Sequence, residues 1–268
     1  MPKQEDKYII NSVLRATQVL DAFTHEKTSF THTELSQKLG INNASLTRIL
    51  HTLVQANFLE KDLSTGTYRL AVKSFQIGSV YLSNVDFHTA AMPHLSELSA
   101  QYGETSNLAI LNGNEVFFLD RVESSESIRL QSLVGSRLPA YCTALGKVLL
   151  AYQDNEFIDQ FLRSTELKKY TPTTITDPEL FKEHLKEIKK QGYAIDNNEH
   201  QPEFKSTAAP IMDNTAKVIA GISIIAPAHR LQDSNHFGKI IDSIVETADK
   251  ISRRLGYMPT ARAYTHKM

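Results

Sequence analysis

Residues 31–55 read THTELSQKLGINNASLTRILHTLVQ, and this stretch decides the fold of the N-terminal part of the chain. Thr31 and Glu34 have the spacing of a capping box, which predicts a helix that begins beside Thr31. Leu35 and Leu39 give this helix one apolar face, and Gly40 favours its end. Residues 31–40 therefore predict one short helix followed by a tight turn.

A second helix is expected directly after this turn. Asn42 can cap it, and apolar residues then repeat at intervals of three and four, at Leu46, Ile49, Leu50 and Leu53. Two short helices joined in this way make a helix-turn-helix. The face opposite the apolar positions carries small or polar residues that could lie in a DNA groove: Asn43, Ala44, Ser45, Thr47, Arg48 and His51.

The flanking sequence completes a small domain. Apolar residues at helical spacing predict an amphipathic helix over residues 12–24. After the motif, Phe58 and Leu59, the turn LSTG at 63–66 and residues 67–70 predict a β-hairpin that would form a wing. We place Arg48, with His51 or Arg69, at phosphates and the polar residues of the second helix at base edges. The candidate DNA contacts are Thr33, Asn43, Ala44, Ser45, Thr47, Arg48, His51 and Arg69.

Composition sets broad limits on the function. The chain has 268 residues, of which 41% are hydrophobic, so two packed domains are expected. Its net charge is −1, but residues 1–80 hold nine Lys and Arg against seven Asp and Glu, a local charge of +2. Cys142 is the single cysteine, which excludes an intramolecular disulfide. The N-terminus lacks the apolar core of a signal peptide and no segment resembles a membrane span, so a cytoplasmic protein without membrane association is expected.

The remainder of the chain predicts an α+β domain. Residues 71–102 favour a linker helix and then a first domain helix, with interruptions near Gly78 and Pro93. The turn NGN at 112–114 joins two apolar runs into a hairpin, and a third strand is expected at 127–134. Helices are expected at 144–152, 177–190 and 235–255, and strands at 192–196, 205–211 and 217–226. This order predicts an antiparallel sheet with helices packed on it.

Three stretches in the same order and spacing resemble the IclR family of bacterial transcriptional regulators. The first is residues 33–70, the second is GSRLPAYCTALGKVLLA at 135–151, and the third combines GYAIDNNEH at 192–200 with AAPI at 208–211 and VIAGISI at 218–224. Asn43 and Ala44 depart from the lysine and hydroxyl residue common in the family, and Asn198, Glu203 and Ser206 also depart from its pattern. The operator sequence therefore does not follow from the resemblance.

The resemblance implies a domain plan. It comprises a winged helix-turn-helix domain at 8–71, a linker helix at 72–86 that pairs two copies, and a GAF-like effector-binding domain at 87–258. It also implies a homodimer or a dimer of dimers on double-stranded operator DNA. Half-sites would then lie about one helical turn, ~34 Å, or a multiple apart.

A small organic acid is the expected effector. Backbone N–H groups at the helix start around Cys142, Thr143, Ala144 and Leu145 suit a carboxylate. The resemblance adds polar groups at Asp196, Ser206 and Ser223, and an apolar wall at Leu130, Leu138 and Phe204. Each has an ordinary alternative, because a strand serine is more often bonded to backbone and a cysteine such as Cys142 is more often a small buried hydrophobe.

Other functions receive less support. Gly146 and Lys147 lack the remaining residues of a phosphate-binding loop, and Asp196, Glu199 and His200 lack a metal-binding motif, so no metal or cofactor is expected and the histidines are interpreted as solvated surface groups. The main alternative is a metabolic enzyme that carries a helix-turn-helix for autoregulation. The second is a module whose helix-turn-helix binds protein. We therefore predict a regulator without enzymatic activity, whose DNA binding an effector controls.

Overall fold

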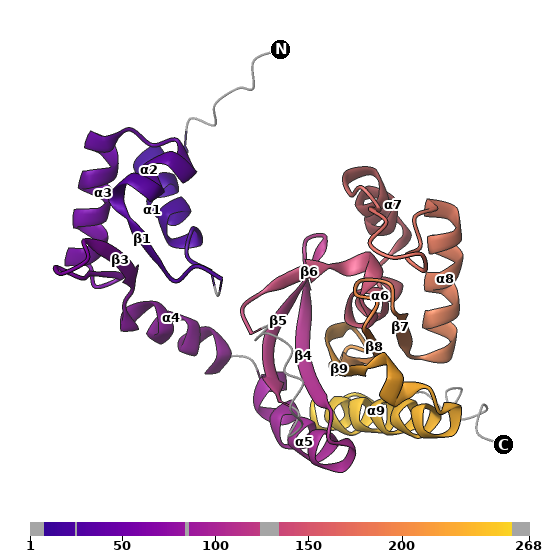
Figure 1. Cartoon of the computed structure of the whole chain (residues 1–268). Coiled ribbons are helices and arrows are strands. Elements are labelled where there is room, and N and C mark those ends of the chain that lie inside the picture. Colours follow the sequence, from indigo (N-terminus) through magenta and orange to yellow (C-terminus); the bar gives the residue numbers. More distant parts are fainter. Residues whose placement is uncertain (1–7, 25, 84–85, 124–133, 259–268) are drawn as a thin grey trace. The chain divides into compact units, whose positions relative to one another are not determined.

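The computed structural model describes residues 8–24, 26–83, 86–123 and 134–258, and the chain divides into two units, Met1–Asn84 and Val85–Met268 (Figure 1). The first unit contains the helices α1 (Asn11–Asp21), α2 (His32–Leu39) and α3 (Asn43–Gln55). Its antiparallel sheet has the order β1-β3-β2, from Ser29–Thr31, Thr67–Leu70 and Leu59–Lys61. The helix α4 (Val72–Ser83) follows β3. The winged helix-turn-helix fold predicted for this part is therefore confirmed.

Local capping explains where α2 and α3 begin and end. The Thr31 hydroxyl accepts the Glu34 amide at 3.3 Å, and Glu34 Oε2 accepts the Thr31 amide at 2.8 Å. Gly40 ends α2 in the left-handed region, with φ 64°. Asn42 Oδ1 then accepts the Ser45 amide at 2.9 Å and starts α3. Each predicted cap of the helix-turn-helix is present.

The core of this unit is formed by the faces that the apolar spacing identified. Leu35 of α2 and Leu46 and Leu50 of α3 are fully buried, beside Val19 of α1. Phe30 of β1 also joins this core, although no strand was expected there from the sequence. A three-residue strand is too short to show alternation, which explains why it was missed.

The second unit is built on a six-stranded antiparallel sheet of order β6-β5-β4-β9-β8-β7. The strands are β4 (Thr105–Asn112), β5 (Glu115–Val122), β6 (Arg137–Pro139), β7 (Ala194–Asn197), β8 (Phe204–Met212) and β9 (Val218–Pro227). Gly113 makes the tight β4–β5 turn with φ 62°. The third strand expected at 127–134 falls almost wholly outside the described residues, and β6 is the strand that pairs with β5.

Helices cover both faces of this sheet. On one face lie α5 (Asp86–Tyr102) and α9 (Ser234–Arg254), and on the other lies α6 (Ala144–Ala151), which α8 (Pro178–Gln191) covers (Figure 1). The expected α+β class is confirmed. The helix α7 (Asn155–Ser164) was not expected, and short 3₁₀ turns lie at Ala140–Cys142 and Ala228–Leu231.

Two expected interruptions do not occur. Gly78 lies inside α4 and Pro93 lies inside α5. A proline removes one helical hydrogen bond, but Ala90, Ala91 and Leu95 around it are buried, so tertiary packing maintains α5 through the proline. None of the described helices is long and apolar enough to cross a bilayer.

Candidate functional site

The first candidate site is the exposed face of α3. Leu46, Leu50 and Leu53 attach α3 to the core, so its other side is left to solvent. Five of the predicted DNA contacts are exposed on this side of α3: Asn43, Ala44, Thr47, Arg48 and His51. Ser45 is half-buried. Thr33 of α2 and Arg69 of β3 are also exposed. The side chains are thus presented at the surface of a rigid helix.

Two of these candidates already have protein partners. The Thr47 hydroxyl donates to the Asn43 carbonyl at 2.8 Å and lies 3.0 Å from Nε2 of His32, a residue that was not selected from the sequence. Arg69 Nε lies 2.6 Å from Glu60 Oε1, directly across the β2–β3 pairing. Within the described part of the chain, Arg48 has no such ion pair. Arg48 is therefore the cation of α3 that is immediately available to a phosphate.

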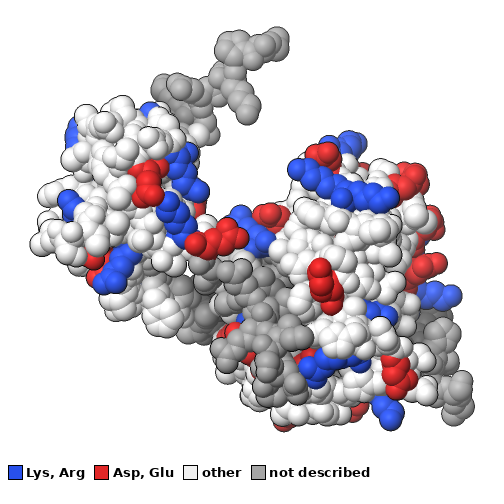
Figure 2. Space-filling view, viewed as in Figure 1, with Lys and Arg blue, Asp and Glu red and all other residues white. Residues whose placement is uncertain are grey.

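The charged side chains of the second unit are of both signs. On the face seen in Figure 2, its Lys and Arg side chains are mixed with Asp and Glu. A mixed surface of this kind creates no extended positive field for a polyanion.

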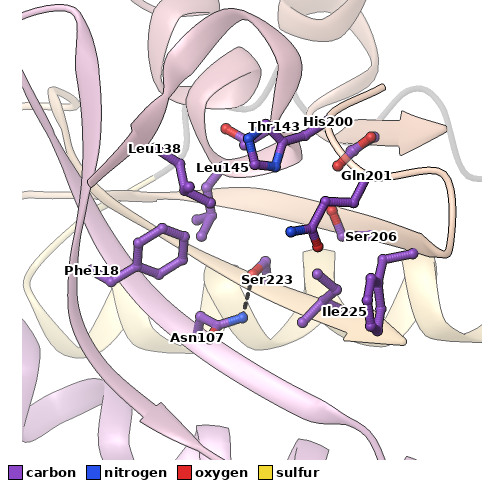
Figure 3. A pocket seen from close by; sticks show the side chains of 12 residues that line it. Asn107, Phe118, Leu138, Thr143, Leu145, His200, Gln201, Ser206, Ser223 and Ile225 are labelled. Carbon is purple, nitrogen blue, oxygen red and sulfur yellow. Dashed lines mark hydrogen bonds between the residues drawn. The ribbon is translucent and has the colours of Figure 1, made fainter. Parts of the chain in front are cut away.

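The second candidate site is a cavity of about 170 Å³ between the sheet and the start of α6 (Figure 3). Six residues of its lining were selected from the sequence, Leu138, Leu145, Asp196, Phe204, Ser206 and Ser223, and Thr143 was named at the helix start. The remaining five were missed, Asn107, Phe118, His200, Gln201 and Ile225. Because β4 is buried on both faces from Thr105 to Ala109, alternation along the strand does not distinguish Asn107 from its neighbours.

Three selected residues are not part of this lining. Cys142 and Ala144 are fully buried in the hydrophobic core beneath the cavity wall. Burial raises the pKa of the Cys142 thiol to about 12, so it remains protonated and acts as an apolar side chain. Leu130 lies outside the described residues.

The start of α6 offers hydrogen-bond donors to this cavity. The Thr143 hydroxyl caps the helix by accepting the Gly146 amide at 3.2 Å, and Lys147 N–H donates to the Thr143 carbonyl at 2.9 Å. The first amides of a helix have no acceptor within the helix, and Thr143 and Leu145 of this helix start line the cavity. Such a helix start favours an anion.

Asp196 gives the cavity an acidic group whose pKa is raised. It is buried, and its Oδ1 accepts the Glu199 amide at 2.7 Å. Burial in the protein interior raises the pKa of Asp196 from 3.8 to about 7. A protonated Asp196 can donate a hydrogen bond to a carboxylate, which an ionised one would repel.

A buried ion pair lies behind this group. Lys147 of α6 is fully buried and pairs with Glu199, and its Nζ also donates to the Ile195 carbonyl at 2.5 Å. The Thr174 hydroxyl donates to the Glu199 carbonyl at 2.6 Å, while Asn198 turns the chain with φ 62°. These contacts fix the loop at 198–201 at the edge of the cavity.

The position of His200 corrects one expectation. The sequence led us to interpret it as a solvated surface histidine, but it lines the cavity. The centroid of its ring lies 5.0 Å from the centroid of the Tyr170 ring. Burial lowers the pKa of His200, so its neutral form is favoured. Among the residues that the structure describes, no three His, Cys, Asp or Glu side chains are grouped to hold a metal.

Two family models match the chain in separate segments. The model described as "Bacterial transcriptional regulator IclR C-terminal" matches residues 79–253, and that described as "IclR helix-turn-helix domain" matches residues 12–63. The chain is 30% identical over 249 residues to the HTH-type transcriptional regulator XynR of Escherichia coli, with 93% of this chain and 98% of XynR covered. It is 34% identical to BhcR of Paracoccus denitrificans, with 92% and 88% covered.

Solved structures agree with these matches. The IclR of Thermotoga maritima superposes with a TM-score of 0.75 at 30% identity, covering 92% of this chain and 99% of that one. An IclR homologue of Microbacterium hydrocarbonoxydans, solved in complex with 4-hydroxybenzoate, superposes with a TM-score of 0.82 at 26% identity, covering 91% and 98%. Both units of the chain thus have counterparts in the same proteins.

Proposed function

The chain belongs to the IclR family of bacterial transcriptional regulators, and on this basis we propose that a small organic acid in the cavity of the second unit controls operator binding by α3. Membership makes it a DNA-binding regulator with an effector-binding C-terminal domain and not an enzyme. The observation that carries the proposal is that the same chain has both an exposed polar helix face in its first unit and, in its second unit, a small cavity at a helix N-terminus.

The DNA-binding proposal rests on α3 and the wing. Arg48 would contact a phosphate directly, and Arg69 would exchange Glu60 for one. Thr33, Asn43, Ala44, Ser45, Thr47 and His51 complete the surface that would face the duplex. The domain limits of 8–71, 72–86 and 87–258 remain part of this proposal, as does a cytoplasmic location, where the bacterial chromosome lies.

An Arg48→Ala variant tests this placement. Fluorescence anisotropy would follow binding to DNA from upstream of the protein's own gene at several salt concentrations. Loss of one phosphate contact should weaken binding to all sequences and reduce the salt slope by about 0.9. Arg163→Ala is the charge-matched control, because Arg163 is exposed on α7 in the second unit. Equal affinities and slopes for the two variants would refute the placement. Absence of any salt-sensitive binding would refute DNA recognition by this face and favour a protein partner.

The organic-acid proposal rests on the cavity. Its volume of about 170 Å³ is close to that of a cavity that holds benzene, roughly 150 Å³, so a small effector fits. The 4-hydroxybenzoate bound by the Microbacterium homologue has this size and one carboxylate. The N-terminal end of α6 and the proton-binding Asp196 would hold such a carboxylate.

Calorimetry with matched compounds tests the charge of the effector. Carboxylates of up to about ten non-hydrogen atoms would be titrated beside their neutral amides, for example benzoate beside benzamide. The helix start should favour the carboxylate. If only the neutral or cationic compounds bind, the organic-acid proposal fails.

Self-association rests on α4. Its apolar side chains are unusually exposed for a helix of this composition, with Val72 70%, Phe75 74% and Val80 61% exposed. We propose that they pack against a second copy, as a dimer or a dimer of dimers, and set the separation of two recognition helices. Phe75→Ser should shift sedimentation toward the monomer, whereas Leu180→Ser, at an exposed apolar position of α8, should not. An unchanged mass for Phe75→Ser would refute this interface.

A further inference from the structure

One amide in the cavity wall has an unused hydrogen-bonding group. Asn107 of β4 is 2% exposed and lies directly opposite Ser223 of β9. Its Nδ2 donates to the Ser223 hydroxyl at 3.2 Å, while its Oδ1 is buried and has no partner among the described residues. Both residues line the cavity, and Figure 3 shows Asn107 and Ser223 together on one side of it.

An unpaired buried amide is costly, so its presence calls for a reason. The carbonyl oxygen has lost its hydrogen bonds to water on burial and has gained none in the protein. The preceding residue of the same strand, Ser106, points to the opposite face of the sheet and is satisfied, because its hydroxyl donates to the Leu95 carbonyl at 2.9 Å. The structure therefore satisfies the polar group that faces the packed helix and leaves without a partner the oxygen of an amide that lines the cavity.

The N-terminal end of α6 and the Asn107 amide lie apart in the lining of the cavity. Thr143, at the N-terminal end of α6, and His200 lie away from Asn107 across the cavity (Figure 3). Apolar side chains, among them Phe118, Leu138 and Leu145, form the wall. A ligand that places its carboxylate at the helix start would therefore bring the other end of its apolar body to the amide.

We propose that Asn107 selects effectors that carry a hydroxyl group remote from the carboxylate, so that the regulator responds to small hydroxycarboxylic acids. The inference rests on the proposed organic-acid effector and narrows it. A hydroxyl can donate to Oδ1, and it can accept from Nδ2 if the amide is turned with Ser223 donating instead. Either orientation of the amide is satisfied by the same ligand group.

Matched acid pairs test this selection on the full-length protein. Butyrate and 4-hydroxybutyrate, and benzoate and 4-hydroxybenzoate, would each be titrated by calorimetry. In at least one pair the hydroxylated member should bind about 10- to 100-fold more tightly, because the plain acid leaves the amide unpaired. Asn107→Leu, which has nearly the same shape, should bring that ratio close to one.

Control variants separate this role from a structural one. Ser106→Ala, on the other face of β4, should keep the preference. Asn107→Ser should lose it as the leucine variant does, and provides a second test if the leucine variant does not fold. Unchanged DNA binding without acid would show that each variant is intact.

The possible failures have different meanings. If no acid of the set binds the wild-type protein, the organic-acid proposal fails and the selection by Asn107 fails with it. If acids bind with no preference in any pair, the selection is refuted and the organic-acid proposal stands. A preference that persists in both Asn107 variants would refute the assignment to this residue.

Discussion

Replacing Asp196 with asparagine should make the stability of the second unit less dependent on pH. The carboxyl has a pKa of about 7 in the folded protein, against an ordinary value of 3.8. The folded state therefore binds the proton more tightly than the unfolded state, and the free energy of unfolding falls as pH rises from about 4 to about 7. Because the two pKa values differ by about three units, the free energy of unfolding is lower above pH 7 than below pH 4 by up to about 4 kcal/mol.

The asparagine side chain would be neutral at every pH and would still present an oxygen to the Glu199 amide, which Asp196 Oδ1 now accepts. At pH 8 we expect the free energy of unfolding of Asp196→Asn to exceed that of the wild type by up to about 4 kcal/mol. At pH 5 this excess should be smaller by about 2–3 kcal/mol. Scanning calorimetry of the full-length protein at pH 5, 6.5 and 8 would measure this difference in the transition of the second unit.

A second carboxylate provides a control of opposite sign. The hydrogen bond from Lys182 lowers the pKa of the exposed Asp159, so its contribution to stability is present at neutral pH and is lost as pH falls. Asp159→Asn should therefore be slightly less stable than the wild type at pH 8. Parallel pH profiles for wild type and Asp196→Asn between pH 5 and 8 would refute the assigned role of burial at Asp196.

Two further predictions concern the packing of α6. Lys147→Met should lower the free energy of unfolding by about 3–5 kcal/mol because it leaves the buried Glu199 without its ion-pair partner. In urea unfolding, the double variant Lys147→Met with Glu199→Leu should recover most of this loss. Equal stabilities of the single and double variants would contradict this reasoning. Gly146→Ala should destabilise by at least about 1–3 kcal/mol because its Cβ would lie 2.1 Å from the Ala140 carbonyl oxygen, whereas Gly78→Ala, in open space within α4, should stabilise by about 0.5–1 kcal/mol. Melting temperatures that change alike in both glycine variants would contradict this reasoning.

Local signals in the sequence predicted local features. Thr31 and Asn42 cap their helices as expected, because a cap depends on residues only two or three positions away. The β4–β5 hairpin followed from its turn for the same reason. The resemblance to a known family supplied five of the cavity residues, and the predicted helix start supplied Leu145.

Features that depend on distant contacts were not predictable in this way. Asn107 meets Ser223 only because β4 and β9 are neighbours in the sheet, although the two residues are 116 positions apart in the chain. Lys147 is the one charged residue of an apolar helix, and its partner Glu199 is 52 positions away. Pro93 shows the converse, since buried neighbours maintain a helix through a residue that local rules place at its end.

The division of the chain into two units, each with its own buried core, affects how the protein can evolve. Substitutions in separate cores with no shared neighbours combine almost additively in their effect on stability. The cavity can therefore accumulate changes that suit a different metabolite without weakening the packing that supports α3. A lineage can in this way retain its target promoters while acquiring a new chemical signal.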